Sequence, residues 1–117
     1  MSGAASYYGG LAAEEMVAQS YRRGGHEITA RRWRSAAGEI DLIAKKDGNV
    51  IFIEVKKSRT FSQAAHALSA RQMRRIYSSA AVYLEGEPNG QDSEARFDVA
   101  LVDQHGRVSI VENAICA

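Results

Sequence analysis

The residues best placed to do chemistry lie on one predicted hairpin, residues 38–57, which reads GEIDLIAKKDGNVIFIEVKK. Four charged residues, Glu39, Asp41, Glu54 and Lys56, alternate with apolar residues along its two strands. Because strand side chains alternate between faces, all four are predicted on one face. Carboxylates directly opposite each other repel, and a divalent cation between them reverses the sign of that interaction. The pattern therefore predicts a site for Mg²⁺ or Mn²⁺.

The turn of this hairpin fixes the register of its strands. Asp47-Gly48 lies between the two apolar-rich runs. A type I′ turn favours this pair, because both central residues of the turn need positive φ. The ladder predicted from that turn pairs Lys46 with Asn49, Ile43 with Phe52, Asp41 with Glu54, and Glu39 with Lys56. The opposite face, predicted to be a core face, carries Ile40, Leu42, Ile51, Ile53 and Val55.

The charged face has two interpretations. It is either a solvated surface, with an ordinary salt bridge between Glu39 and Lys56, or an ion site. Ile43 and Phe52 share this face, and a run such as VIFIEV is typical of a central strand covered on both sides. Charges in such a place are costly unless they are paired or bound to metal. This apolar context favours the ion site.

The sequence GEIDLIA followed by IFIEVK resembles the motif of the PD-(D/E)XK nuclease superfamily. More narrowly, it is similar to the YraN-like family of small bacterial proteins, relatives of the archaeal Holliday-junction resolvases. The similarity extends from about Gly10 to about Val102 and includes a later RFDV. It implies a restriction-endonuclease-like fold and metal-dependent hydrolysis of DNA phosphodiester bonds. The resolvase relatives add branched DNA as the implied substrate and a homodimer as the implied assembly.

The resemblance also implies roles for individual residues. Asp41 and Glu54 would hold Mg²⁺ or Mn²⁺ with the carbonyl of Val55, and Glu39 on the same face is a further candidate ligand. Lys56 would orient the attacking water and offset charge on the phosphate. The family pattern G-x-x-G-E selects Glu14 as a helical carboxylate that reaches toward the metal, with Ala13 in place of the second glycine.

Basic residues near the hairpin are candidates for contacts with DNA. Residues 1–75 carry thirteen Lys and Arg against seven Asp and Glu, whereas residues 76–117 carry two against seven. Ser58 stands where the family usually has arginine, and Arg59 is the nearest substitute. The candidates are Arg31, Arg34, Lys57, Arg59, Arg71, Gln72 and Arg74. Solvated surface charges with no nucleic-acid partner are the other interpretation.

The rest of the chain must supply the elements that hold this hairpin. Apolar periodicity predicts helices over residues 6–23 and 70–84, the second with Ser69 as N-cap, and strands over 26–34, 96–102 and 108–111. Residues 60–68 read as a linker with room for a helical turn, and 85–94 as a polar loop. The resulting order, α-β-β-β-α-β-β, predicts an α/β fold whose mixed sheet has a central antiparallel hairpin flanked by helices.

Three residues outside the hairpin are expected to have structural roles. Trp33 lies in a predicted edge strand and should pack on a helix, although stacking on a base is an alternative. Asp98, in the run RFDV, is predicted to support the fold. His26 follows two glycines and reads as a loop histidine, because no second His or Cys lies at zinc spacing.

Length and composition limit the remaining possibilities. The 117 residues are predicted to form one domain, residues 1–117, with no apolar run long enough for a membrane span and no signal-peptide pattern. The single cysteine, Cys116, fits a reducing cytoplasm. G-x-G-x-x-G, P-loop and G-x-S-x-G motifs are absent. A metal-dependent nuclease is therefore the first hypothesis, a non-catalytic nucleic-acid-binding module the second, and a protein–protein adaptor a weaker third.

Overall fold

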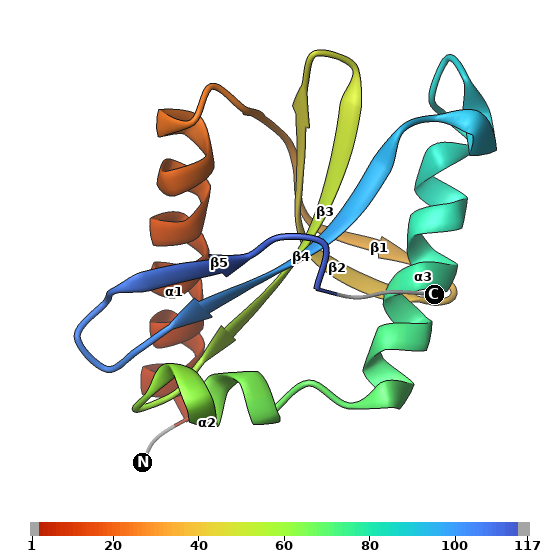
Figure 1. Ribbon diagram of the computed structural model, residues 1–117. Coiled ribbons are helices and arrows are strands. Elements are labelled where there is room, and N and C mark those ends of the chain that lie inside the picture. Colours follow the sequence, from red (N-terminus) through yellow and green to blue (C-terminus); the bar gives the residue numbers. More distant parts are fainter. Residues whose placement is uncertain (1–2, 115–117) are drawn as a thin grey trace.

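The computed structural model describes the backbone of residues 3–114 and the side chains of residues 12–114. Cys116, on which the expectation of a reducing compartment rests, lies outside the described residues. The elements follow in the order α1 (Gly3–Arg23), β1 (Glu27–Ser35), β2 (Gly38–Lys46), β3 (Asn49–Lys57), α2 (Phe61–His66), α3 (Ala70–Leu84), the 3₁₀ turn η1 (Gly90–Asp92), β4 (Ala95–Val102) and β5 (Val108–Val111) (Figure 1). This order confirms the predicted succession of elements, with α2 in the predicted linker.

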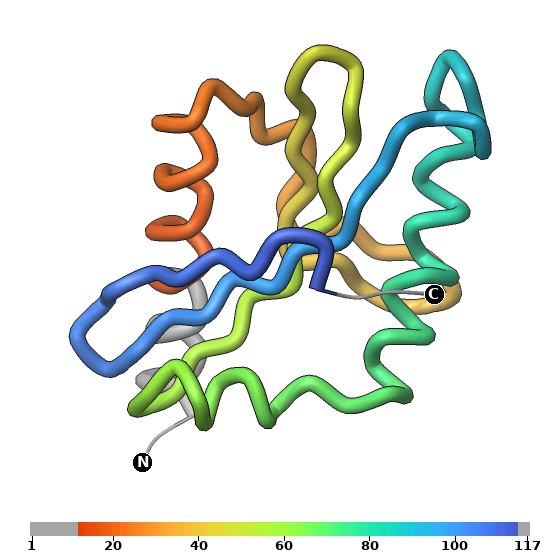
Figure 2. The backbone as a smooth tube through the Cα atoms, viewed as in Figure 1, coloured from red at the N-terminus to blue at the C-terminus, as the bar shows by residue number. Residues whose placement is uncertain are grey.

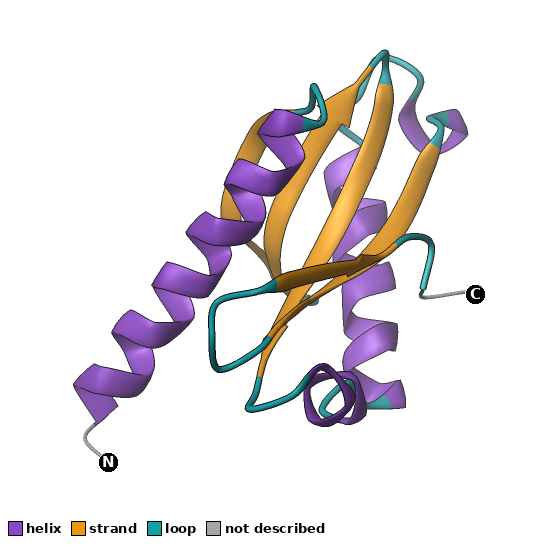
Figure 3. Cartoon of the chain, turned by 60° about the vertical axis from the view of Figure 1, so that its left-hand side comes forward, coloured by secondary structure: helices purple, strands orange, loops and turns teal. Residues whose placement is uncertain are grey.

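The strands form one mixed sheet in the order β1-β2-β3-β4-β5. Only β3 and β4 are parallel neighbours, and the other pairs are antiparallel. Parallel neighbours need a long crossover, and Figure 2 shows the chain leaving β3 and passing through α2 and α3 before it returns as β4. Helices α1 and α3 cover opposite faces of the sheet (Figure 3). The α/β class and the antiparallel hairpin inside the sheet are confirmed.

The hairpin turn has the predicted conformation and register. Asp47 and Gly48 have φ of 53° and 82°, as a type I′ turn requires. The paired residues extend from Lys46–Asn49 to Leu42–Ile53, where the ladder between β2 and β3 ends. Beyond that point β2 remains paired with β1 but is no longer paired with β3. The prediction that Asp41–Glu54 and Glu39–Lys56 are ladder partners is therefore wrong, because the two strands separate one residue before them.

The separation of the strands also changes the face of one core residue. Leu42, Ile51 and Ile53 pack against α1, as the predicted core face requires, but Ile40 packs with Ile43 on the α3 side. The prediction placed Ile40 with Leu42, and it fails because β2 does not keep strict alternation through Asp41. Gly38, at the start of β2, has φ of 151°, and a Cβ there would lie 3.4 Å from the Ser79 hydroxyl of α3.

Polar contacts secure the elements around the hairpin. The hydroxyl of Ser69 accepts a hydrogen bond from the Gln72 backbone N–H at 3.1 Å, which confirms the predicted N-cap of α3. Thr60 caps α2 in the same way. Trp33 packs edge-on against Tyr83 of α3, with ring centroids 5.4 Å apart, as predicted for an edge-strand tryptophan. Among the described residues, no helix is both long and apolar enough to cross a membrane.

Asp98 has the structural role predicted for it. Its carboxylate is fully buried and accepts hydrogen bonds from the Tyr21 hydroxyl at 2.7 Å, from Arg96 Nε at 3.0 Å and from the Asn113 backbone N–H at 2.9 Å. Burial, together with the bond to Asp98, raises the pKa of Tyr21. These contacts join α1, β4 and the segment after β5. His26, also as predicted, lies in a loop, where its ring meets Tyr21 edge-on.

Replacing the N-cap of α3 should weaken the fold by a measurable amount. We expect Ser69→Ala to lower the free energy of unfolding by about 1 kcal/mol, because the Gln72 backbone N–H in the first turn of the helix loses its acceptor. Ser78→Ala makes the same change at an exposed position of α3 and should alter stability by less than about 0.5 kcal/mol. Urea denaturation of both variants measures the difference, and equal effects would contradict the capping role.

Candidate functional site

The candidate site lies where β2 and β3 separate. Asp41 comes from β2, and Glu54 and Lys56 come from β3 just beyond the last ladder pair. The backbone N–H of Val55 lies beyond the last ladder pair, and it donates to the side chain of Asp41, at Oδ2, at 2.8 Å. Asp41 therefore fills the gap between the strands and holds its carboxylate beside the end of the ladder.

Glu54 is held from two sides. The Gln72 side-chain amide, in the first turn of α3, donates to Glu54 Oε1 at 2.7 Å. The ammonium of Lys56 lies 3.4 Å from the same oxygen. The side chain of Glu54 is only 6% exposed and that of Lys56 is 18% exposed, so this ion pair is largely removed from water. Gln72 was among the residues predicted to contact DNA, and in the structure its side-chain amide contacts Glu54.

The carboxyl groups of Asp41 and Glu54 interact electrostatically. Burial raises the pKa of Asp41 to about 6, the Val55 hydrogen bond opposes that rise, and the charge of Glu14 adds to it. Burial also raises the pKa of Glu54 to about 8, the charge of Asp41 adds to the rise, and Lys56 opposes it. Two such groups titrate as a pair that binds a proton more readily than ordinary carboxylates do. A cation that satisfies both carboxylates would take the place of that proton.

Two further carboxylates lie around this pair, each with an arginine of β1. Glu14 of α1 accepts from Arg32 Nε at 3.0 Å, and Glu39 lies 3.4 Å from Arg34 Nε. Within the described part of the chain, no three His, Cys, Asp or Glu side chains are grouped so that they could hold a metal ion. The structure thus brings Asp41, Glu54 and Lys56 together and keeps Glu14 and Glu39 in ion pairs beside them.

These residues fit a weakly coordinated Mg²⁺ or Mn²⁺. Magnesium in proteins keeps several waters and is commonly bound through one or two carboxylates and substrate phosphates. Asp41 and Glu54 supply one half-buried and one buried carboxylate, both with raised pKa, and the Val55 carbonyl is a further oxygen at the same place in the chain. The donor set lacks soft ligands, which fits Mg²⁺ or Mn²⁺ better than zinc.

The predicted nucleic-acid contacts are spread over several surfaces. Arg31 is paired with Glu15 of α1 at 2.6 Å, and the side chain of Arg34 is 77% exposed despite its pair with Glu39. The remaining basic candidates are exposed, two of them at the end of β3 and after it and two on α3: Lys57, Arg59, Arg71 and Arg74. Strand alternation places Lys57 on the face opposite Lys56. The exposed arginines of α3 are on the same helix as Gln72, which contacts Glu54.

One residue near the site was not among the candidates predicted from the sequence. Arg32 has φ of 46°, a left-handed conformation that is unfavourable for arginine, and its guanidinium binds Glu14. The sequence shows only a run of arginines in β1, and regular alternation would turn Arg31 and Arg32 to opposite faces. No sequence signal predicts that both arginines reach the same helix.

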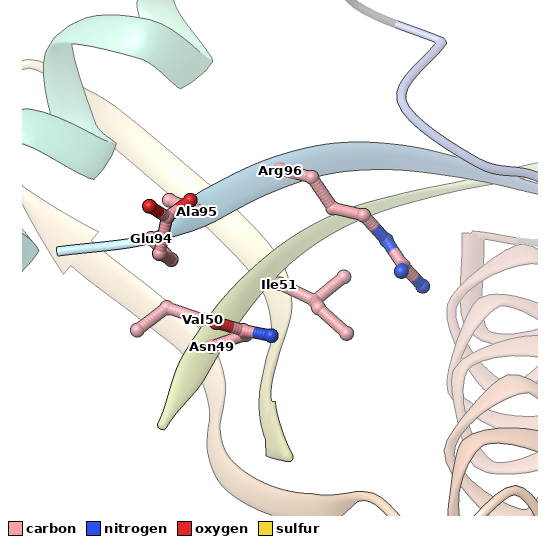
Figure 4. Close-up of a pocket in the computed structure, with 6 residues that line it drawn as sticks. All are labelled: Asn49, Val50, Ile51, Glu94, Ala95 and Arg96. Atoms are coloured by element: carbon pink, nitrogen blue, oxygen red, sulfur yellow. The ribbon is translucent and has the colours of Figure 1, made fainter. Parts of the chain in front are cut away.

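Two pockets of the described residues are lined by neither Asp41, Glu54 nor Lys56. One, of about 180 Å³, is lined by Asn49, Val50, Ile51, Glu94, Ala95 and Arg96 at the start of β3 and β4 (Figure 4). Its arginine is already bound to Asp98, and in the figure that side chain points toward α1. A second, of about 210 Å³, is apolar and is lined by residues of α2, α3, β4 and β5 with neighbouring loops. Neither contains a titratable pair like Asp41 and Glu54, so the chemistry favours the strand-separation site.

Comparison with known proteins places the chain among relatives of similar length. A family model described as "Uncharacterised protein family UPF0102" matches residues 13–102. Two UPF0102 proteins of Cereibacter sphaeroides, from strains ATCC 17029 and ATCC 17023, are each 59% identical over 117 residues and cover 100% of both chains. A UPF0102 protein of Ruegeria pomeroyi is 52% identical over 112 residues, 96% of this chain and 91% of that protein. The expected YraN-like family is thereby confirmed, and none of these names states an activity.

Removing the charge of Asp41 should flatten the pH dependence of stability. Because both carboxyls have raised pKa values, the folded protein binds more protons than the unfolded chain between about pH 4 and about pH 8. The free energy of unfolding contributed by this pair therefore falls as pH rises through that range. We expect the Tm of the metal-free protein to fall less steeply with pH for Asp41→Asn than for wild type. Asp47→Asn, in the turn, should keep the wild-type slope, and equal slopes for all three proteins would contradict the coupling.

Proposed function

The chain belongs to the UPF0102 family, and from the site it carries we propose that it is a metal-dependent nuclease that hydrolyses phosphodiester bonds of DNA. One observation carries the proposal: the half-buried carboxyl of Asp41 and the buried carboxyl of Glu54, both with raised pKa, lie near the Lys56 ammonium where two strands separate. Acidic groups held close together, with pKa values shifted by burial and by each other, are typical of functional sites. Mg²⁺ or Mn²⁺ is the cofactor that we propose for them.

The sequence motif narrows the proposed reaction. GEIDLIA with IFIEVK resembles the PD-(D/E)XK superfamily, and the mixed sheet with helices on both faces is compatible with a restriction-endonuclease-like fold. From the same resemblance we propose a preference for branched DNA and a homodimeric assembly. The support for both is the analogy with the archaeal resolvases.

The residues of the site would divide the work as follows. Asp41 and Glu54 bind the divalent ion, with the Val55 carbonyl as a further ligand. When bound, the ion supplies positive charge at the scissile phosphate and lowers the pKa of its water. Gln72 fixes the orientation of Glu54 by its hydrogen bond to Oε1. Lys56, beside Glu54, orients the attacking water and stabilises negative charge that develops on the phosphate.

The exposed basic residues would position the DNA. Arg71 and Arg74 extend from α3, and Arg59 follows β3, so cations lie on two of the segments that meet near Glu54. Contacts of this kind go mainly to phosphate oxygens and carry no sequence information. They support binding that depends on salt and on the shape of the DNA rather than on its sequence.

A non-catalytic nucleic-acid-binding module is the second candidate function. It is favoured by the ion pairs that already occupy Glu14 and Glu39, which leave only two carboxylates for a metal ion. Such a module would bind DNA through the same basic residues without turnover. Cleavage assays on single-stranded, duplex, flap and four-way DNA with Mg²⁺ or Mn²⁺ distinguish the two candidates.

Asp41→Asn should remove cleavage and weaken metal binding, because an uncharged amide is a poorer ligand for a hard cation. The metal-free variant should melt no lower than wild type, since the repulsion between Asp41 and Glu54 is relieved. Single-turnover cleavage and Mn²⁺ titration measure the two effects. Asp47→Asn makes the same change on the same hairpin and keeps a favourable turn pair, so it should cleave like wild type. A variant Asp41→Asn that cleaves normally would exclude Asp41 as a ligand.

Lys56→Ala and Arg74→Ala each remove one positive charge but should differ in kind. Loss of Lys56 should lower the single-turnover rate by orders of magnitude with little change in DNA affinity, because Lys56 acts mainly in the transition state. Loss of Arg74 should weaken binding of all sequences and reduce the salt slope by about one unit. Fluorescence-anisotropy titrations over a salt series accompany the cleavage assay. If both variants only bind less tightly and no metal-dependent turnover exists, the binding module is the correct function.

A further inference from the structure

Two consecutive arginines of β1 reach the same helix. Arg31 lies 2.6 Å from Glu15, and Arg32 lies 3.0 Å from Glu14, the residue before it in α1. Successive side chains of a regular strand point to opposite faces, so one arginine must depart from strand geometry. Arg32 does so, with φ of 46°. The left-handed backbone turns its side chain toward α1.

This conformation has a cost that the ion pair offsets. A left-handed backbone is unfavourable for a residue other than glycine, because its Cβ then lies too close to the following carbonyl oxygen. Glycine or asparagine would tolerate it better, yet the position holds arginine. The carboxylate side chain of Glu14 is only 12% exposed, whereas that of Glu15 is 45% exposed. A carboxylate so far removed from water needs a cation, and Arg32 is placed to supply it.

The charge of Glu14 also acts on the centre of the site. Glu14 repels Asp41, which is itself repelled by Glu54, while Lys56 offsets part of this repulsion. Arg32 lies between Arg31 and Trp33 on β1, and these two pair with Leu42 and Ile40, the residues that flank Asp41 on β2. The ion pair of Arg32 and Glu14 therefore lies beside the part of β2 that carries Asp41, and the carboxylates of Glu14, Asp41 and Glu54 come from α1, β2 and β3. Two cationic side chains, Lys56 on Glu54 and Arg32 on Glu14, balance them.

We propose that Arg32 is a built-in counter-ion of the metal site: its guanidinium neutralises Glu14 while the site is empty, and a divalent cation bound at Asp41 and Glu54 takes over that neutralisation. The inference rests on the proposed function, because it concerns the same metal site. Arg32 then stabilises the metal-free protein more than the loaded one. By linkage, a group that favours the empty state weakens binding of the cation.

The linkage gives a test with a definite sign. We expect Arg32→Gln to lower the Tm of the metal-free full-length chain and to lower the dissociation constant for Mn²⁺ several-fold. Mn²⁺ should therefore raise the Tm of the variant by more than it raises that of wild type. Isothermal titration calorimetry and thermal melts with and without Mn²⁺ measure both quantities. Asparagine tolerates positive φ, so Arg32→Asn removes the charge without backbone strain. It should show the same gain in Mn²⁺ affinity if the effect comes from the charge.

A double-variant cycle assigns the effect to Glu14. With Glu14→Gln already present, Arg32→Gln should improve Mn²⁺ affinity by much less, because the carboxylate that Arg32 neutralises is gone. Arg22→Gln, in an exposed pair with Glu15, is the matched control for loss of one positive charge and should leave Mn²⁺ affinity near that of wild type. The inference is overturned if Arg32→Gln lowers Tm equally with and without Mn²⁺, or if its gain in affinity persists undiminished in the double variant.

Failure of the inference and failure of the proposed function give different results. If wild type binds Mn²⁺ and neither Arg32→Gln nor Arg32→Asn binds it more tightly, only the counter-ion proposal is overturned. Wild type that neither binds Mn²⁺ nor melts higher with it overturns the metal site and the counter-ion together. The expected affinities without cleavage of any DNA substrate would support the counter-ion and overturn the nuclease.

Discussion

The hydrogen bond from the Val55 N–H to the Asp41 carboxylate sets the geometry of the whole site. Where β2 leaves β3, the central strand loses a ladder acceptor, and a buried N–H without a partner is costly. Asp41 supplies that acceptor with its side chain, so the point where the strands separate is also the point where a half-buried carboxylate is held. Glu54, the residue before Val55, is then fixed next to this charge, because the ladder residues before it hold β3 in register.

The cost of this arrangement is electrostatic and is shared among several elements. The carboxyls of Asp41 and Glu54, both with raised pKa, would separate if either were mobile, but Val55 holds the first and Gln72 holds the second. Lys56, on the same strand as Glu54, reduces the repulsion between the carboxylates. Arg32 of β1 reduces it by pairing with Glu14. Lys56 lies on β3 and Arg32 on β1, and the sheet holds both strands in place. The fold therefore maintains a cluster of charge that would not stay together in an isolated hairpin.

The sequence predicts those parts of the site that depend on local rules. Asp47-Gly48 specified the turn and the register as far as Leu42–Ile53, and Ser69 marked the start of α3, because turn and cap preferences act over a few residues. The separation of β2 from β3 occurs where β2 stays paired with β1 and packs against α3, and these tertiary contacts are not encoded in a local sequence pattern. For the same reason the face of Ile40 was predicted wrongly and the left-handed Arg32 was not foreseen.

The parallel pairing of β3 with β4 explains why α3 serves the site. A parallel neighbour requires a crossover, and this one begins directly after Lys57 at the end of β3 that carries Glu54. The helix that returns the chain to β4 must therefore start near that end, and its first turn places Gln72 against the Glu54 carboxylate. Its cap, Ser69, fixes the turn that holds Gln72. The orientation of the buried glutamate thus follows from the topology of the sheet, and a change that loosens the start of α3 acts on the charge cluster even though it touches none of its carboxylates.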